Sequence, residues 1–182
     1  MSKYMILLIN GSYGVGKTTV GRILRQRIAG SRLYNPEWSG SVLMRLPVKF
    51  NGSGTDDFQD IDLWRKSVVG GIKIFRFFAS GTVIVPMTFS RQDYFDEITG
   101  GIRQLDGEVR IFCLLASFET ILKRLKMRGE KIEDGESNWS VRKAKKCVEA
   151  HKDEVFGKTI NTNELNAGEV ADEILRNLSV NS

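Results

Sequence analysis

The sequence predicts a three-layer α/β fold built around a five-stranded parallel sheet. Short apolar segments typical of buried strands alternate with longer segments of helical periodicity along the chain. A glycine-rich phosphate-binding motif directly follows the first apolar segment, where a doubly wound sheet places its ligand. The length of 182 residues is enough for one domain with its own core, so we expect a single domain over residues 1–182.

The five expected strands are short and rich in Val, Ile, Leu and Phe. The third ends at Pro86, which cannot donate a hydrogen bond to a sheet. Because helical segments separate the strands, we expect them to run parallel, with helices on both faces. They cover residues 4–10, 32–34, 82–85, 109–115 and 158–160.

The expected helices show apolar residues at three- and four-residue spacing, as in the series Ile61, Trp64 and Val68. They cover residues 17–29, 57–79, 91–105, 117–128 and 140–152, with a last helix after a capping box at 166–169. Two segments are expected to be irregular. The first, 35–56, is broken by proline and glycine, and the second, 129–140, is polar and acidic.

The most informative segment fits the pattern G-x-x-x-x-G-K-[ST] of the phosphate-binding P-loop. Its glycines let the backbone turn N–H groups toward phosphate oxygens, and the following helix presents the positive end of its dipole. Lys17 is expected to reach the β- and γ-phosphates, and Thr18 to hold Mg²⁺ through its hydroxyl. The flanking strand and helix argue against a chance glycine-rich turn, so the motif predicts a P-loop NTPase fold. The expected nucleotide-binding residues of this segment are Gly11, Ser12, Tyr13, Gly14, Val15, Gly16, Lys17, Thr18 and Thr19.

Arginines gather after the fourth expected strand. Arg124 and Arg128 are four residues apart and share one face of a helix, and Arg142 begins the next helix. Residues 121–152 carry ten Lys or Arg against five acids, an excess that suits a polyphosphate ligand. Two basic helices joined by a polar loop are typical of a helical lid, which we expect at about 126–143 and which would stabilise charge on a transferring phosphoryl group. A solvent-facing basic hairpin is the alternative.

Acidic residues that could serve an acceptor hydroxyl follow the second expected strand. Glu37, in the segment Tyr34-Asn35-Pro36-Glu37, is the candidate to orient or deprotonate the acceptor. Asp56 and Asp57 are further candidates for this role, although Asp57 also suits a helix cap. Arg65 on the following helix could bind an anionic acceptor. A solvated surface position is the alternative for each of these residues.

The composition argues against several classes of protein. The net charge is +5, but no stacking-aromatic pattern accompanies the basic segment, so nucleic-acid binding is not favoured. No apolar stretch has the length of a membrane span. Cys113 and Cys147 do not make a disulfide framework, and Met1-Ser2-Lys3 leads directly into a strand, so we expect a cytoplasmic protein with reduced thiols. His151, the single histidine, is expected on the surface, and no Cys/His cluster for a metal is present.

Several longer motifs together resemble one known family. They are Ile9 to Thr18, Tyr34-Asn35-Pro36-Glu37 with Gly40, Asp56-Asp57-Phe58-Gln59 with Leu63-Trp64-Arg65, Ile84-Val85-Pro86-Met87-Thr88 with Tyr94-Phe95, Leu122-Lys123-Arg124-Leu125, and Ile160 to Leu165. In these motifs, over most of residues 5–175, the chain resembles the tunicamycin-resistance ATP-binding proteins, a branch of the small P-loop kinase-like group.

The resemblance implies ATP binding with Mg²⁺, a nucleotide-kinase-like fold with strand order 2-3-1-4-5, and a lid that bears arginines. It also implies resistance to, or modification of, a nucleoside-type antibiotic. Asn35 stands where the family more often has Asp, and no Asp ends the third or fourth strand, so we expect Mg²⁺ to rest on Thr18, the phosphates and water. The base contact is expected from the loop near Thr162-Asn163, with Asn163 as the candidate residue, which leaves ATP and GTP both open.

Three functions remain open from the sequence. The first is an ATP-dependent kinase of a nucleoside-like or sugar-bearing small molecule. In it, Lys17 and the three arginines stabilise charge, while Glu37 serves the acceptor. The second is a protein that binds ATP and sequesters a drug without phosphoryl transfer. The third is an NTPase linked to nucleic acid, which only the excess of basic residues favours. An exposed face on the helix expected at 57–79 also leaves a homodimer open.

Overall fold

The computed structural model describes residues 4–43, 57–79, 81–105 and 107–179, and it contains the expected five-stranded parallel sheet. The strand order is the one that the resemblance implied, 2-3-1-4-5. The strands are β1 (Met5–Gly11), β2 (Arg32–Leu33), β3 (Thr82–Pro86), β4 (Glu108–Leu115) and β5 (Lys158–Asn161). Every pairing between neighbouring strands is parallel, so all carboxyl ends lie at one edge of the sheet.

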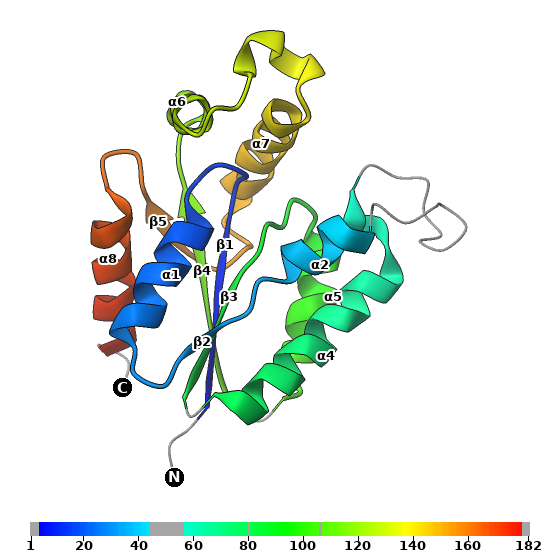
Figure 1. The fold of residues 1–182 in the computed structure, drawn as a ribbon, viewed down its shortest axis with the longest axis vertical. Helices are drawn as coiled ribbons and strands as arrows, with labels where there is room; N and C mark the ends of the chain where they lie inside the picture. The colour runs from blue at the N-terminus through cyan, green and yellow to red at the C-terminus, as the bar shows by residue number, and fades with distance from the viewer. Residues whose placement is uncertain (1–3, 44–56, 80, 106, 180–182) are drawn as a thin grey trace.

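Helices cover both faces of the sheet and make the three expected layers (Figure 1). The α-helices are α1 (Lys17–Arg27), α2 (Pro36–Leu43), α4 (Asp62–Phe78), α5 (Gln92–Arg103), α6 (Phe118–Met127), α7 (Trp139–Ala150) and α8 (Ala167–Ser179). Three short 3₁₀ segments are η1 (Phe58–Asp60), η2 (Ile132–Ser137) and η3 (His151–Asp153). In Figure 1, α1 and α8 lie side by side on one face, α4 and α5 pack together on the other, and α6 and α7 extend beyond the carboxyl ends of the strands.

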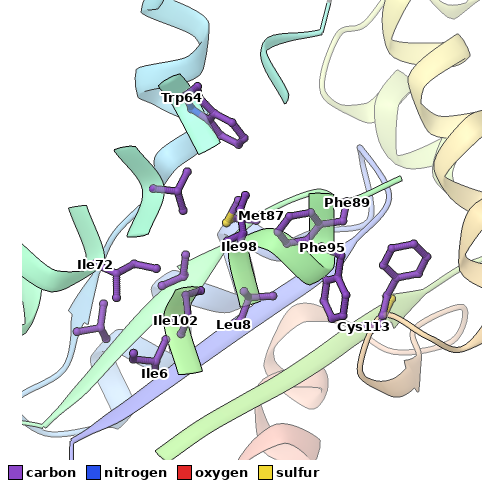
Figure 2. Packing of buried hydrophobic residues seen from close by; sticks show 14 of the residues in the cluster. Ile6, Leu8, Trp64, Ile72, Met87, Phe89, Phe95, Ile98, Ile102 and Cys113 are labelled. Carbon is purple, nitrogen blue, oxygen red and sulfur yellow. The ribbon is translucent and has the colours of Figure 1, made fainter. Parts of the chain in front are cut away.

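The side chains of β1 alternate between two separate cores. Ile6 and Leu8 point to the face that α4 and α5 cover, where they pack in one cluster with Trp64 (Figure 2). Leu7 and Ile9 point to the opposite face and pack with residues of α1 and α8. Because both faces are covered, each of these four strand residues is buried, which explains the continuous apolar run of the sequence.

The segment expected to be irregular from residue 35 begins instead with a helix, α2. Asn35 caps it, because its Oδ1 accepts the backbone N–H of Glu37 at 3.1 Å. Pro36 occupies the first helical position, where a missing N–H and a fixed φ are no disadvantage. The prediction was wrong because it treated the proline as a helix breaker, although it stands at the start of the helix.

Close contacts hold α2 against its neighbours. The indole N–H of Trp64 donates to the carbonyl of Pro36 at 3.1 Å. A Cβ on Gly40 would lie 2.6 Å from the ring of Phe58 and 2.9 Å from Nε1 of Trp64. Gly40 therefore permits a close approach inside the helix, and these contacts set the position of Glu37, the residue after Pro36.

Two further boundaries differ from the sequence prediction. The helix expected at 57–79 is divided at Ile61, whose extended backbone separates η1 from α4. The segment 129–140, expected as a loop, contains η2 and the first residues of α7. Asp56, a candidate for the acceptor side, lies outside the described residues. In the described part of the chain, no helix combines the length and apolar character needed to cross a bilayer.

Candidate active site

The loop between β1 and α1 has the geometry of a phosphate-binding loop. Gly14 and Gly16 have φ angles of 85° and 110°, which residues with side chains rarely adopt, and Gly16 is the N-cap of α1. α1 thus begins at the carboxyl edge of the sheet, and the unpaired N–H groups of a helix N-terminus attract anions. Of the expected ligand residues in this first turn, Thr18 is half-buried and Thr19 is exposed.

Lys17 is buried and spans this loop. Its Nζ donates to the carbonyls of Gly11 and Ser12, each at 3.0 Å. Burial lowers the pKa of the ammonium group, and the nearby Glu37 carboxylate opposes that effect. Only 6% of Lys17 is exposed, so its charge acts in a medium of low dielectric constant and would attract phosphate strongly.

The α6–α7 hairpin packs directly against the loop. The hydroxyl of Ser12 donates to the carbonyl of Ala144 at 3.3 Å. The ring of Tyr13 meets that of Trp139 edge to face, with ring centroids 5.4 Å apart, and its hydroxyl donates to Glu130 at 3.4 Å. The segment that the sequence predicts as a lid therefore contacts the phosphate-binding loop.

A cavity of about 240 Å³ opens beside the loop and is bordered by residues of α1, α6 and α8. Arg124 lies in its wall and donates to the carbonyl of Val15 at 3.1 Å and to the hydroxyl of Thr162 at 3.0 Å. Burial and the neighbouring Arg128 guanidinium lower the pKa of Arg124. A partly apolar cavity of this size beside a phosphate-binding loop suits a nucleotide base.

Two other predicted residues on this side have different surroundings. Arg128 is exposed and lines the same cavity, and its charge contributes to the lowered pKa of Lys17. Asn163 does not line the cavity. Its Oδ1 accepts the backbone N–H of Ser117 at 2.8 Å, which fixes the start of α6. Thr162, one residue earlier, lies in the cavity wall.

Glu37 lies in the first turn of α2. Its Oε1 is buried and has no hydrogen-bond partner among the residues that the structure describes. Burying a carboxylate oxygen without a partner costs free energy, so such an oxygen indicates a place for a proton or cation of a ligand. Of the charges that raise the pKa of Lys17 and so oppose the effect of burial, that of Glu37 has the largest effect.

Thr88, a buried residue at the same edge of the sheet, is not among the site residues that the sequence predicts. Its carbonyl accepts the side-chain N–H of Gln59 at 2.7 Å, while its Oγ1 is buried without a partner in the described part of the protein. The next residue, Phe89, donates its N–H to Oδ1 of Asn10 at 2.9 Å, which ties the end of β3 to β1. The available signal was a polar residue directly after an apolar strand.

A second cavity, of about 260 Å³, lies between α7 and η1. Asp57 lies in its wall, where it caps η1 and forms an ion pair with Lys143. Arg142 also lines this cavity and donates to the carbonyl of Ser137 at 2.8 Å. The structure thus brings Asp57 and Arg142 together, in a cavity separate from the one that the other two arginines line.

Arg65 is not brought into the site. Its Nε donates to Glu97 at 2.6 Å and its Nη1 to the carbonyl of Gln59 at 2.7 Å. Its guanidinium also lies over the ring of Tyr94, 4.3 Å from the centroid. These contacts fasten α4 to η1 and α5, and they leave only 11% of the side chain exposed.

The two cysteines are free and buried, as the sequence predicts. Burial raises the pKa of the Cys113 thiol to about 12, which keeps it protonated and unreactive. Within the described residues, no group of three or more His, Cys, Asp or Glu side chains is placed to hold a metal ion.

His151, which the sequence analysis placed on the surface, is buried. It is 3% exposed, and its Nε2–H donates to the carbonyl of Phe89 at 2.7 Å. The ring also packs against Phe156, with ring centroids 5.1 Å apart. The prediction was wrong because it extended the exposure of the preceding basic helix to His151. In the structure, η3 directs the imidazole ring inward, against the segment that follows β3. Burial lowers the pKa of His151 below 6.5.

Acidification is expected to destabilise the fold through His151. Between its lowered pKa in the fold and 6.5, the unfolded chain binds more protons than the folded one, so unfolding becomes easier as the pH falls. The free energy of unfolding should drop there by up to about 1.4 kcal/mol per pH unit. Urea unfolding at several pH values below neutrality measures this slope. His151→Gln retains a side-chain donor and should flatten it; an unchanged slope in the variant would contradict the prediction.

The parallel sheet, its strand order and the glycine-rich loop define a P-loop protein of the kinase-like type. The chain belongs to an AAA domain family, which it matches over residues 6–146. No curated protein matches its sequence.

Solved structures share this fold over nearly the whole chain. A tunicamycin resistance protein of Deinococcus radiodurans is 24% identical, with 96% of this chain and 95% of that chain covered and a TM-score of 0.75. A gluconokinase from Sinorhizobium meliloti 1021 is 16% identical, with 100% of this chain and 99% of that chain covered and a TM-score of 0.64. A shikimate kinase from Acinetobacter baumannii, in complex with shikimate, is 19% identical, with 98% of this chain and 95% of that chain covered and a TM-score of 0.64. At these identities the likeness establishes the fold alone.

Proposed function

We propose that this protein transfers the γ-phosphoryl group of ATP to a hydroxyl group of a small molecule. Glu37 carries the proposal, because its buried Oε1 has no partner among the described residues and its charge acts on Lys17. A base near the lysine that binds the β- and γ-phosphates is what such a transfer needs. The gluconokinase and the shikimate kinase with the same fold support a kinase.

In this proposal the protein positions the reactants and stabilises charge. Glu37 accepts the proton of the acceptor hydroxyl as the hydroxyl oxygen bonds to the γ-phosphorus and the bond from that phosphorus to ADP breaks. Lys17 stabilises the negative charge that develops on the phosphate oxygens. The hydroxyl of Thr18 is an oxygen donor of the kind that Mg²⁺ prefers, and bound Mg²⁺ would neutralise charge on the phosphates.

The predicted arginines would serve different parts of the nucleotide. Arg124, which Val15 and Thr162 hold in place, would form a wall of the base site. Arg128 is exposed at the same cavity and would approach the phosphates when the α6–α7 hairpin closes over them. A closed hairpin would also exclude water, which favours transfer to the acceptor over hydrolysis.

The tunicamycin resistance protein of Deinococcus radiodurans supports a nucleoside antibiotic as one acceptor to be tested. The second candidate function is a protein that binds ATP and sequesters such a drug without transfer. It is favoured by the end of β3, where Pro86 and Met87 stand in place of an aspartate that would hold Mg²⁺. The two functions use the same site and differ in whether ADP forms.

Measuring ADP release from ATP and Mg²⁺ distinguishes the two functions. The acceptor panel contains nucleosides, nucleotides, sugar acids and nucleoside antibiotics, tunicamycin among them. We expect one class of acceptor to stimulate ADP release, with an equal amount of phosphorylated product detected by mass spectrometry. Saturable binding of both ATP and a drug, with no ADP released on adding any compound, would contradict the kinase and support sequestration.

A further inference from the structure

We propose that the cavity between α7 and η1 binds an anionic group of the acceptor, a carboxylate or a phosphate. This inference rests on the proposed function and deepens it: the acceptor hydroxyl lies at Glu37 while its anionic group enters the cavity. The acceptor is then a small organic acid or a phosphate monoester. A neutral molecule would offer no charge to the ammonium group of Lys146, which lines this cavity.

The basic groups of this cavity outnumber its acids, and the acids already have partners. Asp57 forms an ion pair with Lys143, and Asp60 accepts the hydroxyl of Tyr94 at 2.8 Å. Lys146 lines the same cavity, and its side chain makes no ion pair or hydrogen bond to any residue in the described part of the chain. The cavity therefore holds an ammonium charge that no described residue neutralises.

Arg142 stands beside this ammonium group. It precedes Lys146 by four residues on α7, so both side chains leave the helix on one face, and both line the cavity. Its guanidinium donates to the carbonyl of Ser137 at 2.8 Å. A guanidinium and an ammonium one helical turn apart suit an oxyanion, because they offer several charged N–H donors from two directions.

One helix, α7, connects the cavity with the phosphate-binding loop. Trp139 in its wall packs edge to face against a ring of the phosphate-binding loop. Burial raises the pKa of Cys147, one turn beyond Lys143 on α7, while the charges of Lys17 and Lys143 oppose this effect. Helix α7 thus provides a wall of the cavity and also contacts the phosphate-binding loop, where the hydroxyl of Ser12 donates to the carbonyl of Ala144 at 3.3 Å. An acceptor whose anionic group enters the cavity would therefore lie beside this loop.

Trp139 allows a test that needs no turnover, since its ring is 38% exposed in the cavity wall. The full chain is first saturated with a non-hydrolysable ATP analogue and Mg²⁺, which occupies the phosphate-binding loop. It is then titrated with inorganic phosphate, D-gluconate and D-glucose while tryptophan fluorescence is recorded. We expect saturable changes with the two anions and none with glucose, and the stronger anion identifies the group that the cavity prefers. Trp139→Phe should abolish the signal.

Charge variants assign the binding to the cavity. Lys146→Gln and Arg142→Gln should each weaken binding of the preferred anion by about tenfold, the typical effect of losing one charged hydrogen bond. Lys145→Gln is the matched control, because Lys145 is exposed on the same helix and does not line the cavity. Binding of this variant should stay within about twofold of wild type.

The proposal is overturned if wild type binds neither anion saturably, or if Lys145→Gln weakens binding as much as Lys146→Gln. These outcomes are independent of catalysis. Turnover of a neutral acceptor without anion binding would refute the anionic site and keep the kinase. Anion binding at the cavity without ADP release by any acceptor would keep the site and refute the transfer.

Discussion

Replacing Lys17 by alanine is expected to lower kcat/KM for ADP formation by more than about 10³-fold. The ammonium group is buried and held by two carbonyls of the loop, at a position where the β- and γ-phosphates would bind. In surroundings of low dielectric constant its loss removes far more stabilisation of the transition state than the loss of a surface charge. Steady-state ADP release with the best acceptor of the panel measures the effect.

Lys123→Ala is the matched control for this variant. Lys123 is exposed on α6, so the substitution removes the same charge away from the loop and should leave turnover unchanged. The melting temperatures of both variants report whether they are folded, because Lys17→Ala also removes two hydrogen bonds to the loop. Wild-type turnover by a folded Lys17→Ala protein would refute the role of the loop in transfer.

Replacing Glu37 by glutamine is expected to lower kcat by about 10²- to 10⁴-fold, with the KM for ATP little changed. The amide keeps the size of the side chain but cannot accept the proton of the acceptor hydroxyl. The backbone of α2 should stay in place, because the cap from Asn35 and the hydrogen bond from Trp64 to Pro36 do not involve the Glu37 side chain. Steady-state kinetics with varied ATP and acceptor separates kcat from both KM values.

Glu119→Gln is the corresponding control, since Glu119 is an exposed glutamate in the first turn of another helix, α6. It should leave kcat and both KM values close to those of wild type. A Glu37→Gln protein that keeps kcat but loses affinity for ATP or the acceptor would show that Glu37 binds a ligand and is not the base.

The parts of the fold that the sequence predicted correctly depend on local pattern. The apolar run of β1 and the helical spacing of α4 and α5 are properties of neighbouring residues, and both appear in the structure as expected. α2 was missed because proline and glycine have opposite effects at different helix positions. Pro36 at the first position favours the helix, and Gly40 is needed only because Phe58 and Trp64 lie so close.

The candidate site also has a part that the sequence predicts and a part that it does not. The loop that contains Lys17 could be predicted from one octapeptide, because backbone conformation and ligand contacts both come from consecutive residues. The roles of the charged residues outside this loop could not be predicted from the sequence. Arg65 and Arg142 look equally available in the sequence, yet one fastens α4 to α5 and the other lines a cavity. His151 and Thr88 become buried only when segments far apart in the chain meet.

The sequence alone determined the sheet of alternating strands and helices and the phosphate-binding loop, because periodicity and the glycine pattern act within a few residues. Only the tertiary structure decided which charged and polar groups lose their water. The packing of α2 on Trp64 buries Oε1 of Glu37, which has no partner among the described residues. The ion pair between Asp57 and Lys143 joins the N-cap of η1 to α7, two segments far apart in the sequence. Desolvation depends on packing between distant segments, and it is desolvation that makes a charged side chain part of a site.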